Sequence, residues 1–216
     1  MEHAFGLDIP LTLDEVCDPQ RLALLVYDMQ VGVVSQLHDG AEITHRVAAV
    51  VQTARDAGLR IFFTRHMWLP LEVAGVSQLR TAMAWQRVNR AIDLKPALQR
   101  DSPVFQIVPE LTPRSSEAVF DKITMSAFEG TPLGIALRDC RLVAFAVVGV
   151  ALEIGIEPTV RHATDLGYIP IVVTDACGSR DHAAAARSLA TLAFAGGSLQ
   201  TDAATLAAAL SRTRDA

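Results

Sequence analysis

Short apolar runs without polar interruption are the feature that most constrains the fold of this chain, and the strongest is Arg141–Val148. Successive side chains of a strand point to opposite faces of a sheet, so a run that is apolar throughout has both faces buried. Such runs predict strands covered on both sides. They occur at Leu22–Tyr27, Leu59–Thr64, Glu117–Phe120, Arg141–Val148 and Ile169–Thr174, with a sixth edge strand expected at Ser198–Gln200.

Segments with apolar residues at helical spacing separate these runs. The segment Ala41–Ala57 stops at Gly58, a residue that favours a helix C-cap. Further helices are expected at Ser77–Ile92, from about Thr131–Pro132, after Gly149 toward His162, at Ala183–Ala195 and at Asp202–Leu210. Strands that alternate with helices predict a parallel sheet with right-handed crossovers. The expected fold is therefore α/β, a three-layer doubly wound fold with a mainly parallel sheet of about six strands.

Length and composition narrow the class of protein further. The chain has 216 residues, which predicts a single domain over 1–216. Half of the residues are hydrophobic and 20% are charged, a globular composition that excludes disorder. The net charge of −5, without a local run of Lys or Arg, argues against a nucleic-acid surface. No apolar run reaches the roughly 18 residues that cross a membrane.

The cysteines and the N-terminal segment indicate the compartment. Cys17, Cys140 and Cys177 are an odd number without CxxC spacing, so we expect neither a disulfide framework nor a structural zinc site. Met1–Pro10 carries two acidic residues and no apolar core, so we do not expect a signal peptide. These features predict a cytoplasmic protein.

Polar side chains follow several of the predicted strands. Asp28 follows the first run, Arg65 and His66 the second, Lys122 the third and Asp175 the fifth. Ligands of an open parallel sheet bind at the carboxyl ends of its strands, so an Asp and a Lys at neighbouring strand ends can face each other across one pocket. An ordinary ion pair at the sheet edge is an equally weighted alternative.

The turn Gly149–Gly155 follows the strongest strand run. It has neither GxGxxG spacing nor the GK[ST] ending of a phosphate loop, so a nucleotide site is not expected. Such a turn can instead expose N–H groups at a helix N-terminus that stabilise negative charge. A tight turn that needs small residues is the alternative. We expect no cofactor.

Four segments resemble the isochorismatase-like, or cysteine hydrolase, superfamily. They are Leu24–Gln30 (LLVYDMQ), Lys122–Leu133 (KITMSAFEGTPL), Val148–Ile156 (VGVALEIGI) and Asp175–His182 (DACGSRDH). They lie in the family's order and cover most of the chain, from Leu22 to Ala195. The resemblance implies a Rossmann-like hydrolase that acts on a small molecule and assembles into homo-oligomers, as a dimer or tetramer.

The sequence departs from most of this family at Gly155. Most members carry a nucleophilic cysteine there, which forms a thioester with the help of an Asp and a Lys. Neither Cys140 nor Cys177 matches that position, so covalent acyl transfer by this route is chemically excluded. True isochorismatases resemble this chain in having Gly, but they carry an aromatic residue where Ala151 stands and a His where Glu153 stands.

The resemblance implies roles for further residues. Asp28, Lys122 and Gly155 match the catalytic positions, with Asp28 the proton donor for a reaction such as vinyl-ether hydrolysis. The Lys122 cation would favour ionised Asp28, and an anionic substrate would favour its protonation. Gly155 would leave space for the substrate and keep the N–H groups of the turn exposed. The expected substrate contacts are Arg65, Trp68, Phe128, Ala151, Leu152 and Glu153. The metal site of the nicotinamidase branch is not evident, since only His66 offers a ligand after Arg65, and no metal is expected.

Three hypotheses for the function remain open at this point. The first is a hydrolase without a catalytic cysteine that acts on a small anionic substrate through Asp28 and Lys122. The second is a catalytically silent member that binds a ligand or partner. The third is an amidase in which Asp28 activates water.

Overall fold

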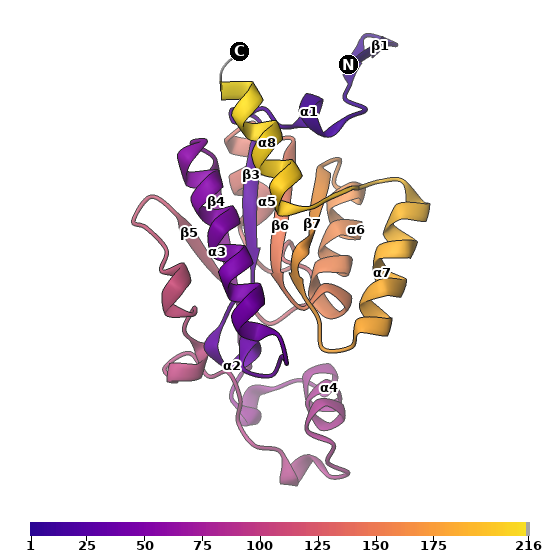
Figure 1. The fold of residues 1–216 in the computed structure, drawn as a ribbon. Helices are drawn as coiled ribbons and strands as arrows, with labels where there is room; N and C mark the ends of the chain where they lie inside the picture. Colours follow the sequence, from indigo (N-terminus) through magenta and orange to yellow (C-terminus); the bar gives the residue numbers. More distant parts are fainter. Residues whose placement is uncertain (215–216) are drawn as a thin grey trace.

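The computed structural model describes residues 1–214 and contains a parallel sheet of six strands in the order β5-β4-β3-β6-β7-β8 (Figure 1). The strands are β3 (Leu22–Tyr27), β4 (Arg60–His66), β5 (Ala118–Lys122), β6 (Ala144–Val150), β7 (Ile169–Gly178) and β8 (Leu199–Thr201).

Strand β3 shows why the apolar runs become central strands. All six of its residues are buried. Leu22, Leu24 and Val26 pack into the core on one face of the sheet, whereas Ala23, Leu25 and Tyr27 pack into the core on the other. Both faces must therefore be covered by helices.

Helices cover the two faces in separate layers (Figure 1). On one face lie α3 (Gly40–Asp56) and α8 (Ala203–Arg214), which pack against each other. On the other lie α5 (Leu133–Asp139), α6 (Glu157–Asp165) and α7 (His182–Ala195). A turn of π-helix, η5 (Leu152–Ile156), joins β6 to α6. The predicted three-layer α/β fold is confirmed.

The remaining elements are short, apart from α4. They are β1 (Glu2–Ala4), β2 (Leu7–Ile9), α1 (Leu13–Val16), α2 (Val31–Val34), α4 (Val76–Gln86) and the 3₁₀ turns η1 (Leu71–Val73), η2 (Ala91–Asp93), η3 (Pro103–Phe105) and η4 (Pro109–Leu111). β1 and β2 form a separate antiparallel hairpin, although no strand is predicted in this part of the sequence. Among the described helices, none is long and apolar enough to cross a membrane.

The connection between β4 and β5 differs from the prediction in two ways. The helix expected over Ser77–Ile92 ends at Gln86, because Arg87 takes a left-handed conformation with φ 54° and donates its N–H back to Ala84 O. Residues 92–116 are the least periodic stretch of the sequence and contain four prolines, which predicts a long surface excursion. The structure instead buries Leu94 and Phe105 of this stretch among other side chains. The connection, with α4, extends beyond one end of the sheet (Figure 1).

Candidate functional site

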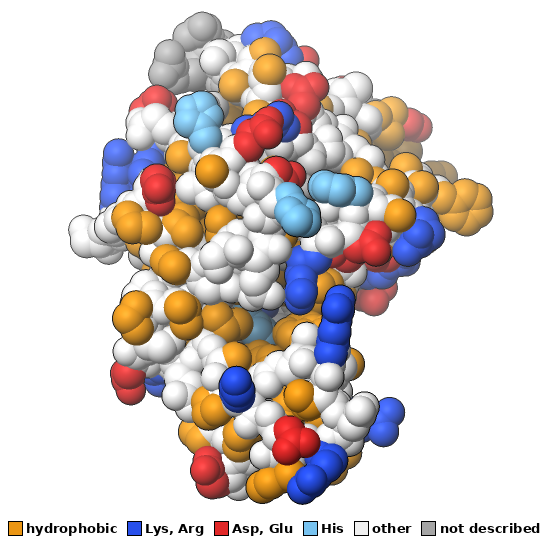
Figure 2. Space-filling model, turned by 60° about the horizontal axis from the view of Figure 1, so that its bottom comes forward, with side chains coloured by type: hydrophobic (Ala, Val, Ile, Leu, Met, Phe, Trp, Pro, Cys, Tyr) orange, Lys and Arg blue, Asp and Glu red, His pale blue; other side chains and the backbone are white. Residues whose placement is uncertain are grey.

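A pocket of about 260 Å³ lies at the carboxyl ends of the central strands. The chain runs from β3 outward to β4 and β5, and from β6 outward to β7 and β8 on the other side, so the strand order reverses between β3 and β6. Such a switch point leaves a crevice where ligands bind in doubly wound sheets. Figure 2 shows the hollow between the body of the molecule and the part beyond the end of the sheet, with basic side chains along one side.

Most of the pocket lining is apolar and comes from both sides of the hollow. The apolar residues are Val33, Trp68, Trp85, Ala97, Leu98, Met125, Val150, Ala151 and Ile154. The polar residues are Tyr27, Asp28, Gln36, His66, Gln86 and Arg180, and Gly155 completes the wall. An apolar cavity with a few convergent polar groups is typical of a small-molecule site.

The carboxylate of Asp28 lies in the pocket wall, just after β3, and both of its oxygens have partners. Oδ1 accepts a hydrogen bond from the Thr64 hydroxyl at 2.7 Å, and Oδ2 lies 2.6 Å from Lys122 Nζ. Asp28 is only 5% exposed and Lys122 only 3%. Because a buried charge is costly unless it is paired, these contacts hold Asp28 in one orientation.

Lys122, the last residue of β5, has a hydrogen-bond acceptor for each ammonium proton. Besides Asp28, Nζ donates to the Tyr27 hydroxyl at 2.8 Å and to Thr124 O at 3.1 Å. Burial lowers the pKa of Lys122, and the charge of Asp28 opposes that effect. The ammonium is thereby fixed behind Asp28 and does not itself line the pocket.

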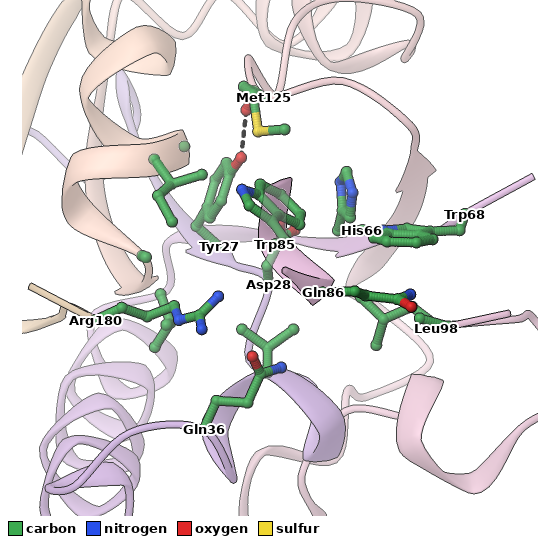
Figure 3. A pocket seen from close by; sticks show the side chains of 16 residues that line it. Tyr27, Asp28, Gln36, His66, Trp68, Trp85, Gln86, Leu98, Met125 and Arg180 are labelled. Carbon is green, nitrogen blue, oxygen red and sulfur yellow. Dashed lines mark hydrogen bonds between the residues drawn. The ribbon is translucent and has the colours of Figure 1, made fainter. Parts of the chain in front are cut away.

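Tyr27 places its ring in the pocket wall, and its hydroxyl donates to Met125 O (Figure 3). Burial, and then the neighbouring charge of Asp28, raise the pKa of Tyr27 well above its ordinary value. The phenol is therefore neutral near pH 7 and keeps its proton.

His66, the last residue of β4, lies on the side of Asp28 opposite to Tyr27 (Figure 3). Burial, and then the Lys122 cation, lower the pKa of His66 to about 4, so its imidazole is neutral at pH 7. Gln30 holds the surrounding backbone: its side chain accepts from His66 N–H at 2.7 Å and donates to His66 O and Phe105 O.

Two glycines bring the β6 turn against β3. Gly149 has φ 122°, and a Cβ there would lie 2.1 Å from Tyr27 O. At Gly155 a Cβ would lie 2.1 Å from the Tyr27 hydroxyl oxygen. The N–H groups of Gly155 and Ile156 both donate to Ala151 O, at 3.0 and 3.1 Å. These two N–H groups are therefore used within the π-helical turn itself.

The family model described as "Isochorismatase domain" matches residues 22–204. The chain belongs to the isochorismatase family. A curated relative, ureidoacrylate amidohydrolase RutB of Cronobacter sakazakii, is 28% identical over 173 residues, which cover 73% of this chain and 75% of the relative. The protein is a hydrolase of this family.

Solved structures of similar fold cover nearly all of this isochorismatase-family chain. A cysteine hydrolase from Pseudomonas syringae pv. phaseolicola has a TM-score of 0.78 and 22% identity, covering 91% of this chain and 95% of that one. N-carbamoylsarcosine amidase from Thermoplasma acidophilum has a TM-score of 0.68 and 21% identity, covering 85% and 96%. At these identities the likeness shows the fold alone.

The structure brings together five of the nine site residues expected from the sequence. Asp28, Gly155, Trp68 and Ala151 line the pocket, and Lys122 contacts Asp28 behind it. Trp68 packs with Trp85 at a ring-centroid distance of 6.2 Å, so the two tryptophans together form one part of the pocket wall.

The other four expected contact residues lie outside the pocket lining. Arg65 pairs with Asp121 at 2.8 Å. Phe128 and Leu152 are buried in the core beneath α5, α6 and α7. Oε1 of Glu153 accepts the N–H of Arg180 at 2.9 Å. The side chain of Glu153 thus positions the segment after β7.

Sequence reasoning missed Arg180, whose guanidinium points into the pocket (Figure 3). The rule of polar residues at strand ends could have found it, but the fifth run was expected to stop at Thr174. Strand β7 continues to Gly178, after an irregularity in its pairing with β6. Asp175 therefore lies within β7, where Oδ1 accepts the N–H of Ala203 at 2.9 Å.

Neither a thiol nor a metal cluster is found at this pocket within residues 1–214. The lining contains no cysteine, and no group of three or more His, Cys, Asp or Glu is placed to hold a metal ion. Cys177 is buried, its thiol contacts Val147 O, and burial raises its pKa well above the ordinary value. It packs as a small apolar residue.

Proposed function

We propose that this protein hydrolyses a small anionic substrate by direct addition of water, with Asp28 moving the proton and without a covalent thioester. The observation that carries the proposal is the buried Asp28–Lys122 pair, with Asp28 in the wall of a pocket whose described lining has no thiol. Gly155 stands, in this proposal, where most of the family has its nucleophilic cysteine.

Arg180 supports an anionic substrate. Its side chain is exposed and enters the pocket from the segment after β7, while Glu153 holds its backbone. A guanidinium binds a carboxylate through two parallel hydrogen bonds, which also orients the substrate. Because most of the lining is apolar, the rest of the substrate finds few hydrogen-bond partners in the pocket. An unsaturated or cyclic carbon skeleton therefore fits best.

Vinyl-ether hydrolysis suits such a site, because it needs a group that transfers a proton but no nucleophilic side chain. Protonated Asp28 transfers its proton to the terminal alkene carbon, and the electron pair of the double bond forms the new C–H bond. Water adds to the resulting oxocarbenium ion and loses a proton to Asp28, and the hemiketal then separates into a ketone and an alcohol. Lys122 stabilises the Asp28 carboxylate between the two proton transfers.

Amide hydrolysis is the second candidate. The relative named ureidoacrylate amidohydrolase, at 28% identity, favours it. In this reaction Asp28 takes a proton from the water that attacks the amide carbon and returns it to the nitrogen, which leaves as ammonia or an amine. The N–H groups of Gly155 and Ile156, already bonded within the turn, give this reaction less support.

A panel assay in D₂O with isochorismate, ureidoacrylate, nicotinamide and simple amides tests the proposal. Pyruvate with deuterium in its methyl group supports vinyl-ether hydrolysis, and release of ammonia supports the amidase. Asp28→Asn keeps the shape but has no transferable proton, so turnover should fall by about 10²–10⁴-fold or more.

Asp175→Asn is the matched control, because Asp175 lies in β7 of the same sheet and outside the pocket. It should keep wild-type turnover. If Asp28→Asn is as active as wild type, the proposed mechanism is wrong. If wild type turns over no compound of the panel, the silent-binder hypothesis replaces it.

A further inference from the structure

The hydroxyl of Tyr27 fills the space that a side chain at position 155 would occupy. A Cβ built on Gly155 would lie 2.1 Å from Tyr27 Oη, 2.4 Å from Cζ and 2.5 Å from Cε1. Atoms do not approach this closely, so Tyr27 in its present place and any residue other than glycine at 155 exclude each other. The phenol is 2% exposed and held at its ring and its hydroxyl, so it does not move aside easily.

Tyr27 Oη is also part of the hydrogen-bonded group that contains Asp28. It accepts from Lys122 Nζ at 2.8 Å, and the same Nζ lies 2.6 Å from Asp28 Oδ2. Its own proton goes to Met125 O, and both Tyr27 and Met125 line the pocket. Rotation about the Cζ–Oη bond takes this proton off the Met125 carbonyl and frees it for another acceptor, without movement of the ring.

We propose that Tyr27 is a further catalytic residue, whose O–H donates a hydrogen bond to the substrate oxygen that gains negative charge during hydrolysis. This inference rests on the proposed function and holds for both candidate reactions. In vinyl-ether hydrolysis the oxygen is the one that leaves the hemiketal, and in amide hydrolysis it is the former carbonyl oxygen. The O–H bond stays intact, and Lys122, which donates to the same hydroxyl, makes it a stronger donor.

The chain offers a matched pair of variants, because it has two tyrosines. Tyr27→Phe keeps the ring and removes the donor. Tyr168→Phe removes a hydroxyl that donates to Gly134 O at 3.0 Å, outside the pocket. With the panel compound that wild type turns over best, Tyr27→Phe should lower kcat by about 10²–10³-fold with little change in KM, as loss of one oxyanion donor does. Tyr168→Phe should keep wild-type kcat.

The pH profile of kcat separates a direct contact from an effect through Lys122. A donor to the substrate lowers kcat at every pH without moving the profile. If Tyr27→Phe moves the profile and keeps the maximal kcat, Tyr27 acts only by positioning Lys122, and the proposal is wrong. If Tyr27→Phe is fully active while Asp28→Asn is not, this inference fails and the proposed function stands. If no panel compound is turned over by wild type, both fail together.

A measurement of thermal stability, without substrate, tests whether Tyr27 occupies the space that a side chain at position 155 would need. Gly155→Ala should lower the Tm markedly in the wild-type background, because its Cβ meets the phenol. In a Tyr27→Val background the phenol is absent, and the same substitution should change the Tm far less. Equal losses of Tm in the two backgrounds would mean that another group excludes side chains at 155, and would overturn the argument from shared space.

Discussion

The buried ion pair shows how single residues set the geometry of the pocket. Asp28 has φ 46°, a left-handed conformation that turns the chain away from β3 immediately after Tyr27. Thr64 and Lys122 then engage one carboxylate oxygen each. A carboxylate held in this way is oriented toward the pocket before any substrate binds, which is how proton-transfer groups gain efficiency.

The energy of that pair can be measured by a double-mutant cycle. Removing one partner of a buried pair leaves an unpaired charge, so Lys122→Met should lower the free energy of unfolding by about 3–5 kcal/mol. Asp28→Asn/Lys122→Met leaves no charge and should cost less than the sum of the single variants. Urea denaturation checks this. Additive losses would mean that the two groups do not interact, and Lys122→Met with wild-type kcat would exclude Lys122 from catalysis.

At the scale of elements, the end of α5 is a place where the sequence departs from the preferred cap. Arg141 N–H donates to Arg138 O and Leu142 N–H to Leu137 O, each at 2.9 Å, which is the Schellman pattern. Arg141 occupies its left-handed position with φ 58°, where glycine is usual.

Arg141→Gly should therefore stabilise the protein. The left-handed conformation costs a residue with a side chain about 1–2 kcal/mol, and the extra freedom of glycine in the unfolded chain takes back about half of that gain. We expect a net gain of about 0.5–1 kcal/mol in the free energy of unfolding, seen as a higher midpoint in urea. Arg138→Gly, within the helix, is the control and should lower stability. A loss of stability in Arg141→Gly would show that the Arg141 side chain makes a stabilising contact.

At the scale of the whole molecule, the reversal of strand order explains why residues far apart in sequence meet in one pocket. Asp28 comes from the end of β3, Gly155 from the turn after β6 and Arg180 from the segment after β7, and Lys122, the last residue of β5, contacts Asp28 behind the pocket. The connection from β4 to β5 supplies the tryptophans on the opposite side. Homo-oligomerisation stays a prediction.

Acid stability of the whole fold should depend on His66. Its folded pKa of about 4 lies below the ordinary value of 6.5, so between these values the unfolded chain binds more protons. The contribution of neutral His66 to the free energy of unfolding is complete above about pH 6.5. As the pH falls from 6.5 toward 4, the free energy of unfolding decreases by on the order of 3 kcal/mol. His66→Gln should flatten the pH dependence of the free energy of unfolding across this window. His45→Gln, on the exposed surface of α3, should not. An unchanged slope in His66→Gln would contradict the assignment.

The sequence by itself determined the layers of this fold and two of the central site residues. Apolar runs such as Leu22–Tyr27 have no solvated face, so they dictate a covered sheet, and the carboxyl ends of parallel strands bring Asp28 and Lys122 to one edge. Tertiary structure alone decided that Tyr27 fills the space beside Gly155 and that Arg180, not Arg65, enters the pocket. The physical reason is that strand periodicity fixes which face a residue takes, whereas the length of β7 and the distance between two packed segments depend on contacts between residues far apart in the chain.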